Sequence, residues 1–255
     1  SYNKDSSDII ASGAKPFDTE DQEFTDESVN TSIVSKFKDF ANFSAIYRES
    51  KRKIYQSRYD MSPVGTEDTN YNYKGNLFDL RTDFSVIKND ILTLNLGAAL
   101  TLEKMNNALP DMFSVYTETA AAQQLEGFYS KIGVKLSEQT LLETGYRLET
   151  EKLEKLADSY QVGLSKTAGD STVKAEYSAG FKTASLFQKY AGDYGNPNLK
   201  PEYAKNVSLS MEHKFSDQFY GSIAFFSTSY KDLISYVGLP PTGQYENVSQ
   251  SKTSG

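Results

Sequence analysis

Apolar and polar residues alternate one by one along most of the chain. In the stretch STVKAEYSAGF, Val173 and Tyr177 fall on one side of an extended chain and Lys174 falls on the other. The stretches ILTLNLGAALTLEK (91–104) and NVSLSMEHKF (206–215) repeat this pattern. A period of two residues is typical of strands with one apolar and one polar face, so the pattern predicts an all-β, antiparallel fold.

About ten to eleven strands are expected. The ten clearest segments are 28–37, 42–52, 72–86, 91–104, 121–136, 140–151, 158–166, 171–181, 206–215 and 219–236. Several are longer than the ~5–6 residues usual for strands of soluble sheets. In the last segment the phase of the alternation is ambiguous, because Phe225 and Phe226 are adjacent.

The connections between these strands alternate between short and long. Short hairpin turns such as KND (88–90) and SDQ (216–218) are followed by long polar links such as 53–71 and 187–205. One rim of tight turns and one rim of long loops is typical of an antiparallel transmembrane β-barrel of the outer-membrane type. A soluble antiparallel sandwich, which also alternates and has turns, remains the alternative.

Composition excludes several classes of function. The 255 residues include no Cys and one His, His213, so thiolate metal sites, disulfides and His-dependent triads are not expected. No nucleophile–base pattern or phosphate loop is present, which argues against an enzyme. The net charge of -7 argues against a nucleic-acid partner. The chain starts at Ser1 without Met and ends within a repeating pattern, so we expect an excerpt or a processed piece.

Four blocks carry a resemblance to a known family. They read GFKTASLFQKY (180–190), GNPNLKPE (195–202), YKDLI (230–234) and YENV (245–248). In this order they resemble the barrel of TonB-dependent outer-membrane receptors, most closely the cobalamin receptor and its siderophore-receptor relatives. The rest of the chain shares the strand layout of that family.

The resemblance implies a location and a mechanism. In this family the barrel has about 22 strands, so residues 1–255 would form part of a C-terminal barrel domain whose plug, TonB box and final strands are absent. The implied function is uptake of a scarce ligand, a cobalamin or a ferric siderophore, across the bacterial outer membrane, driven by the TonB complex. A non-transporting outer-membrane barrel or a surface adhesion protein is the alternative.

Tyrosines of the predicted extracellular loops are the candidate ligand contacts, because an aromatic face offers contact area at little entropic cost. They are Tyr116, Tyr190, Tyr194 and Tyr236. Tyr at a barrel rim is also common in interfacial girdles, and that interpretation stays open. The block 195–202 is expected to shape its loop rather than to contact ligand, with Gly195 allowing positive φ. Haem receptors of this superfamily carry an axial His within the corresponding stretch, and here there is none.

Two charged runs fall in predicted loops. The acidic run FDTEDQEFTDE (17–27) is dense in the oxygen ligands that calcium prefers, and the resemblance also implies calcium held by loop aspartates. The candidates are Asp18, Asp21 and Asp26. A solvated acidic loop is the alternative. The basic run RESKRKIYQSR (48–58) suits membrane lipid, lipopolysaccharide or an anionic ligand, or else forms a snorkelling rim cluster.

Overall fold

The computed structural model describes residues 2–10, 20–59, 66–110, 116–152, 154–238 and 243–255. They form one antiparallel sheet of twelve strands that follow one another in chain order. The strands are β1 (Tyr2–Ile10), β2 (Glu20–Phe37), β3 (Ala41–Tyr59), β4 (Thr66–Lys88), β5 (Leu92–Pro110), β6 (Tyr116–Ser137), β7 (Thr140–Glu151), β8 (Glu154–Ala168), β9 (Ser171–Lys182), β10 (Glu202–Lys214), β11 (Tyr220–Val237) and β12 (Gln244–Ser254). The all-β antiparallel prediction is confirmed, and the count of ten to eleven strands was low because β1 and β12 were not recognised.

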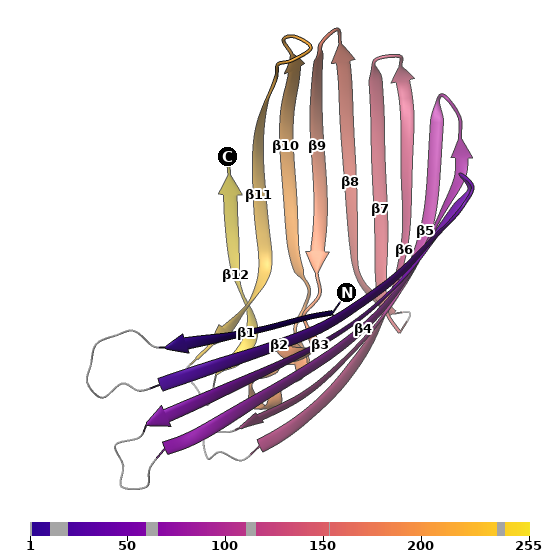
Figure 1. The fold of residues 1–255 in the computed structure, drawn as a ribbon. Coiled ribbons are helices and arrows are strands. Elements are labelled where there is room, and N and C mark those ends of the chain that lie inside the picture. The colour runs from indigo at the N-terminus through magenta and orange to yellow at the C-terminus, as the bar shows by residue number, and fades with distance from the viewer. Residues whose placement is uncertain (1, 11–19, 60–65, 111–115, 153, 239–242) are drawn as a thin grey trace.

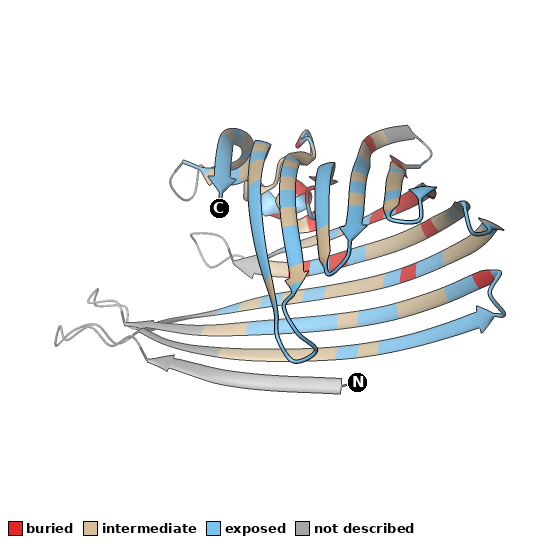
Figure 2. Ribbon diagram, turned by 90° about the horizontal axis from the view of Figure 1, so that it is seen from above, coloured by how far each residue is buried: buried red, intermediate tan, exposed pale blue. Residues whose placement is uncertain are grey.

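The sheet curls strongly, so that β1–β4 lie across a hollow from β9–β12 (Figures 1 and 2). Because neighbouring strands are antiparallel, the tight turns lie at one end of the sheet and the longer links lie at the other, where the β7–β8 connection between Glu151 and Glu154 is also short. This layout confirms the predicted asymmetry of the connections. The β3–β4 and β5–β6 links are shorter than predicted, because the strands continue beyond the apolar pattern, with β3 reaching Tyr59 and β4 starting at Thr66. The β9–β10 link, 183–201, is as long as predicted.

The two charged runs therefore lie in strands and not in loops. Residues 20–27 belong to β2, and residues 48–58 belong to β3. The register sets them side by side, with Asp26 opposite Arg52 and Glu27 opposite Lys51. Opposite charges on paired strands attract, and this compensates for the low strand propensity of Asp, Glu and Lys. The prediction of loops was wrong for residues 20–27 and 48–58, because each charged run was considered without the strand that pairs with it.

The convex face of the sheet is apolar over a band that begins at the tight turns. In β10, Val207, Leu209 and Met211 are exposed, whereas Ser208 and Ser210 on the other face are half-buried. Bands of alternating exposure recur on neighbouring strands (Figure 2). This confirms the predicted phase of the strand 206–215, including the placement of Leu209 on the apolar face.

The same register resolves the ambiguity in β11. Phe225 lies opposite Leu209, and Phe226 lies opposite Ser208. Because directly paired residues share a face, Phe225 belongs to the convex face and Phe226 points into the hollow. Phe226 is thus an aromatic residue of the inner face, which periodicity alone could not decide.

Aromatic residues border the apolar band at both edges. Tyr47, Tyr146, Tyr160 and Tyr177 are exposed where the band ends toward the longer links. Phe40, Phe215 and Phe219 are exposed near the tight turns. Two aromatic girdles around an apolar band are a feature of barrels that span a membrane. These positions account for part of the high Tyr and Phe content of the sequence.

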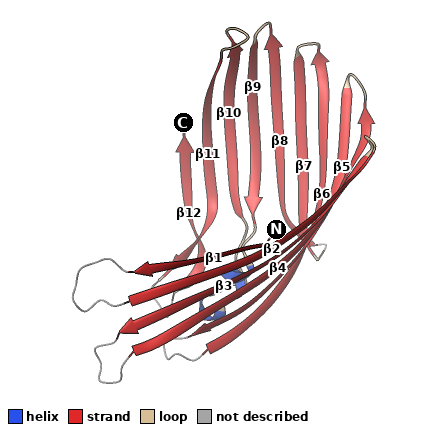
Figure 3. Ribbon diagram, viewed as in Figure 1, coloured by secondary structure: helices blue, strands red, loops and turns tan. Residues whose placement is uncertain are grey.

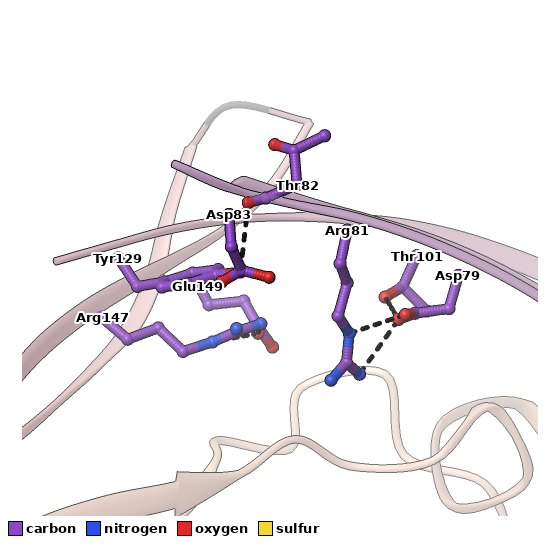
Figure 4. Close-up of polar contacts among 8 residues, drawn as sticks. All are labelled: Asp79, Arg81, Thr82, Asp83, Thr101, Tyr129, Arg147 and Glu149. Carbon is purple, nitrogen blue, oxygen red and sulfur yellow. Dashed lines mark hydrogen bonds and ion pairs between the residues drawn. The ribbon is translucent and has the colours of Figure 1, made fainter. Parts of the chain in front are cut away.

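The inner face carries a polar network over β4–β7 (Figure 4). Tyr129 donates from its hydroxyl to Asp83 Oδ1 at 2.7 Å, and Arg81 Nε donates to Asp79 Oδ1 at 2.7 Å. Arg147 Nη2 donates to Glu149 Oε2 at 2.6 Å, and its guanidinium lies 5.8 Å from the centre of the Tyr129 ring. The polar face of the alternation is therefore a connected surface and not a set of isolated solvated side chains.

Gly97 makes room for this network, and replacing it by Ala should disrupt it. A Cβ at Gly97 would overlap the Tyr129 ring, so the ring must move and lose its bond to Asp83. We expect Gly97→Ala to lower the free energy of unfolding by about 1–3 kcal/mol. The control is Gly180→Ala, because a Cβ there meets nothing within 4 Å. Equal denaturation midpoints for the two variants would contradict the packing argument.

Candidate ligand-binding site

The link between β9 and β10 folds into the hollow of the sheet at the end where the longer links meet (Figure 3). It contains a short helix α1 (Leu186–Tyr190) and a 3-10 turn η1 (Gly192–Tyr194). The helix α1 lies against β5 and β6, and η1 lies against β6 and β12. Among the described residues no helix is long and apolar enough to cross a membrane.

Local sequence explains how the link is shaped. Ser185 and Gln188 form a capping box, in which each side chain binds the other's backbone N–H and satisfies the first turn of α1. Leu186 is almost fully buried and anchors the helix. Gly195 has φ -74°, so the prediction of positive φ there was wrong. Gly is required instead for space, because a Cβ would lie 2.7 Å from the Ala191 nitrogen.

Hydrogen bonds tie the second half of the link to β11 and β12. Asn247 accepts from the Lys200 N–H at 2.9 Å and donates to the Lys200 carbonyl at 3.0 Å and the Asp232 carbonyl at 2.7 Å. Asn196 Nδ2 donates to the Tyr245 carbonyl at 2.9 Å. The blocks GNPNLKPE, YKDLI and YENV thus meet at one place. We call the bonds of Asn247 to Lys200 and Asp232 the Asn247 clamp.

A further bond supports the bend in β11 beside this clamp. Glu202 Oε1 accepts from the Ile234 N–H at 2.8 Å, and Glu202 Oε2 accepts from Lys182 Nζ at 2.9 Å. The register of β11 with β12 shifts around this position, and Asp232 has φ 57°. A β-bulge re-aims the side chains that follow it, which here include Tyr236.

Five aromatic residues from distant parts of the chain gather around the folded link. The ring of Phe187 lies 5.9 Å from Tyr73 and 6.2 Å from Tyr245. Tyr236 lies 6.0 Å from Tyr194 and 5.6 Å from Tyr245. We call this set the aromatic cluster. Burial raises the pKa of Tyr73 and of Tyr245, so both hydroxyls stay protonated and able to donate at neutral pH.

A pocket of about 740 Å³ opens beside the aromatic cluster. It lies between α1 and the inner faces of β2–β5, and its volume is in the range of small-molecule sites. Its lining includes Asp26, Arg52, Tyr73, Asn107 and Phe187. We call it the α1 pocket.

An ion pair beyond the apolar band closes one side of the α1 pocket. Arg52 donates from Nε and Nη2 to the two carboxylate oxygens of Asp26, at 2.7 and 2.9 Å. These hydrogen bonds lower the pKa of the Asp26 carboxyl, which stays charged at neutral pH. Because both side chains are partly exposed, the pair contributes little to stability but fixes the position of the guanidinium.

The predicted contact residues are only partly brought together. Tyr194 and Tyr236 are in the aromatic cluster. Tyr190, at the end of α1, is 39% exposed. Tyr116 starts β6, and its side chain lies outside the described residues. Whether any of them contacts a ligand stays a prediction.

Sequence reasoning missed three members of the aromatic cluster: Tyr73, Phe187 and Tyr245. Phe187 and Tyr245 stand inside the blocks GFKTASLFQKY and YENV, and the capping box around Ser185 was a readable sign of a helix there. Nothing near Tyr73 in the sequence distinguishes it from a girdle residue. Its partner comes from more than a hundred positions away along the chain.

The proposed calcium ligands are not gathered in the described part of the chain. Asp26 binds Arg52, Asp21 lies in β2 without a described side chain, and Asp18 lies outside the described residues. Within the described ranges no group of three or more His, Cys, Asp or Glu side chains is placed to hold a metal ion. Calcium binding therefore stays a prediction.

Comparison with known proteins shows the family to which this chain belongs. The family model described as TonB dependent receptor-like, beta-barrel, matches residues 2–255. A curled antiparallel sheet with an apolar outer band agrees with that match, and the chain belongs to this family.

The similar proteins are named for different ligands. The vitamin B12 transporter BtuB of Vibrio cholerae is 40% identical over 76 residues, which are 30% of this chain and 12% of that protein. The siderophore receptor PirA of Pseudomonas aeruginosa is 16% identical with a TM-score of 0.60, covering 98% of this chain and 55% of that one. The copper transporter OprC is 14% identical with a TM-score of 0.68, covering 92% and 44%. This chain therefore spans about half the length of these solved structures, and at such identities they show the fold alone.

Proposed function

We propose that this chain is part of the barrel domain of a TonB-dependent outer-membrane transporter that imports a cobalamin or a ferric siderophore. The observation that carries the proposal is the inward fold of the β9–β10 link. It places the aromatic cluster and the α1 pocket on the inner face, at the end that the longer links define as extracellular in barrels of this type. A ligand arriving from outside meets these residues first.

The rest of the barrel serves passage and not chemistry. The inner face is polar from β4 to β7, and its charged side chains are paired with one another. In the proposed mechanism the aromatic residues, the α1 pocket and a plug domain hold the ligand. The TonB complex, pulling on that plug, opens a path along the polar face. The ligand leaves unaltered, which agrees with a family of transporters and receptors.

The basic residues of β3 and β4 suit a further partner on the convex face. Lys51, Lys53 and Lys74 are exposed beyond the edge of the apolar band, where headgroups of an outer membrane would lie. Lys51 and Lys74 also lie 3.0 and 3.9 Å from Glu49. We propose that lipopolysaccharide contacts these lysines, since clustered lysines at a membrane surface attract anionic headgroups.

Uptake measurements test the proposed function. The full-length receptor is expressed in a strain that lacks its other TonB-dependent transporters, with and without TonB, and is given cyanocobalamin, ferric siderophores or haemin. We expect TonB-dependent uptake of a cobalamin or a siderophore. Ligand binding without TonB-dependent uptake would favour a non-transporting barrel or an adhesion protein. Haemin as the transported ligand would overturn the ligand assignment.

A further inference from the structure

The α1 pocket contains a buried hydrogen-bond donor without an acceptor. Asn107 is 4% exposed, and its Nδ2 is buried and has no hydrogen-bond partner. An unsatisfied buried amide costs free energy, and such groups are rare in folded proteins unless a bound group completes them. Asn107 lines the α1 pocket, so an entering ligand is the available source of an acceptor.

The one charged residue in the same row as this donor, Arg52, is already compensated, and the rest of the lining mixes the acidic Glu27 and Glu103 with the basic Lys51, Lys74 and Lys104. Tyr73 pairs with both Arg52 and Asn107 across neighbouring strands, so the three residues form one row of the inner face. The guanidinium of Arg52 is engaged by both carboxylate oxygens of Asp26. An anionic ligand would have to compete with that carboxylate and approach its negative charge. A neutral acceptor meets neither penalty.

Aromatic surface completes the row. The rings of Tyr73 and Phe187 lie 5.9 Å apart with a 49° angle between their planes, and both line the α1 pocket. Aromatic faces favour flat, weakly hydrated groups and contribute contact area without charge. The row therefore offers one free amide donor beside two rings.

From this arrangement we propose that the α1 pocket recognises an uncharged part of the ligand that carries a carbonyl or amide oxygen. Asn107 Nδ2 donates to that oxygen, and Tyr73 and Phe187 flank it. This rests on the proposed function and adds the chemical class of the group that is held, with Asn107 as a residue that determines specificity.

The test is the substitution Asn107→Leu in the full-length receptor, with cyanocobalamin and ferric enterobactin as probes. We expect the affinity for the bound probe to fall about tenfold, the effect of losing one hydrogen bond in a water-excluded site. The Tm should stay constant or rise, because the variant removes an unsatisfied buried polar group and keeps the branched shape and the number of heavy atoms of the side chain. A merely structural role of Asn107 would lower the Tm instead.

The matched control is Asn106→Leu, the same change at the next residue, which is exposed. It should leave the affinity unchanged. The fold loss of affinity in Asn107→Leu should also be the same, within about twofold, at about 50 and 500 mM sodium chloride, because salt screens charge–charge contacts and spares neutral ones.

Three results would count against the proposal. Unchanged affinity in Asn107→Leu, or a loss of affinity that shrinks steeply as salt is added, would overturn this inference and leave the transport function standing. Failure of the full-length receptor to bind either probe would overturn both.

Discussion

Replacing Leu209 by Arg should lower the free energy of unfolding of the full-length receptor in a bilayer by about 2–4 kcal/mol. Leu209 is half exposed in the middle of the apolar band, between Ala175 on β9 and Phe225 on β11. The two residues directly paired with this position on the convex face, Ala175 and Phe225, offer a guanidinium no polar group. It would have to reach the membrane surface along its own side chain, at a cost in conformational freedom and in local bilayer distortion.

The control for this substitution is its neighbour on the other face. Ser208→Arg adds the same charge to the same strand but points into the polar hollow, so we expect a change of about 0.5 kcal/mol or less. Denaturant-induced unfolding in phospholipid vesicles measures both. If Ser208→Arg proves the more damaging of the two, the convex face is not the lipid face and the register of β10 is shifted by one residue.

This pair of variants follows from information already present in the sequence. Alternation fixes which face of a strand is apolar, and β10 keeps the predicted phase from Val207 to Met211. Alternation says less about where a strand ends. The strands β2 and β3 extend through runs of charge that look like loop, because their stability comes from the partner strand and not from their own composition.

The residues of the candidate site were harder to predict from the sequence than the faces of the strands. The blocks around residues 180–202 and 230–248 marked the region, and two of the predicted tyrosines, Tyr194 and Tyr236, lie in the aromatic cluster. Tyr73 and Asn107 had no local signal, because a period of two describes a face of a strand and not what packs over it. Their role depends on α1 folding inward, which is a long-range contact.

Removing the Asn247 clamp should strongly reduce ligand binding and uptake. Its one side chain satisfies the Lys200 N–H, the Lys200 carbonyl and the Asp232 carbonyl at once. Asn247→Ala leaves all three without that partner and removes one of the ties between the link and β12, while the bond of Asn196 to the Tyr245 carbonyl remains. Since the link carries Phe187 and Tyr194, we expect ligand affinity and uptake to fall about tenfold or more, because the site is no longer preorganised.

A second substitution at Asn247 distinguishes the loss of its hydrogen bonds from the introduction of a charge. Asn247→Asp keeps an acceptor for the Lys200 N–H but sets a carboxylate beside two carbonyl oxygens, so it should impair uptake at least as much as Asn247→Ala. Asn198→Ala, at an exposed residue of the block GNPNLKPE, should have little effect. Hydrogen exchange of residues 183–201 should rise in both Asn247 variants and not in Asn198→Ala. If exchange stays at the wild-type level while uptake falls, Asn247 acts on the ligand directly and not by positioning the link.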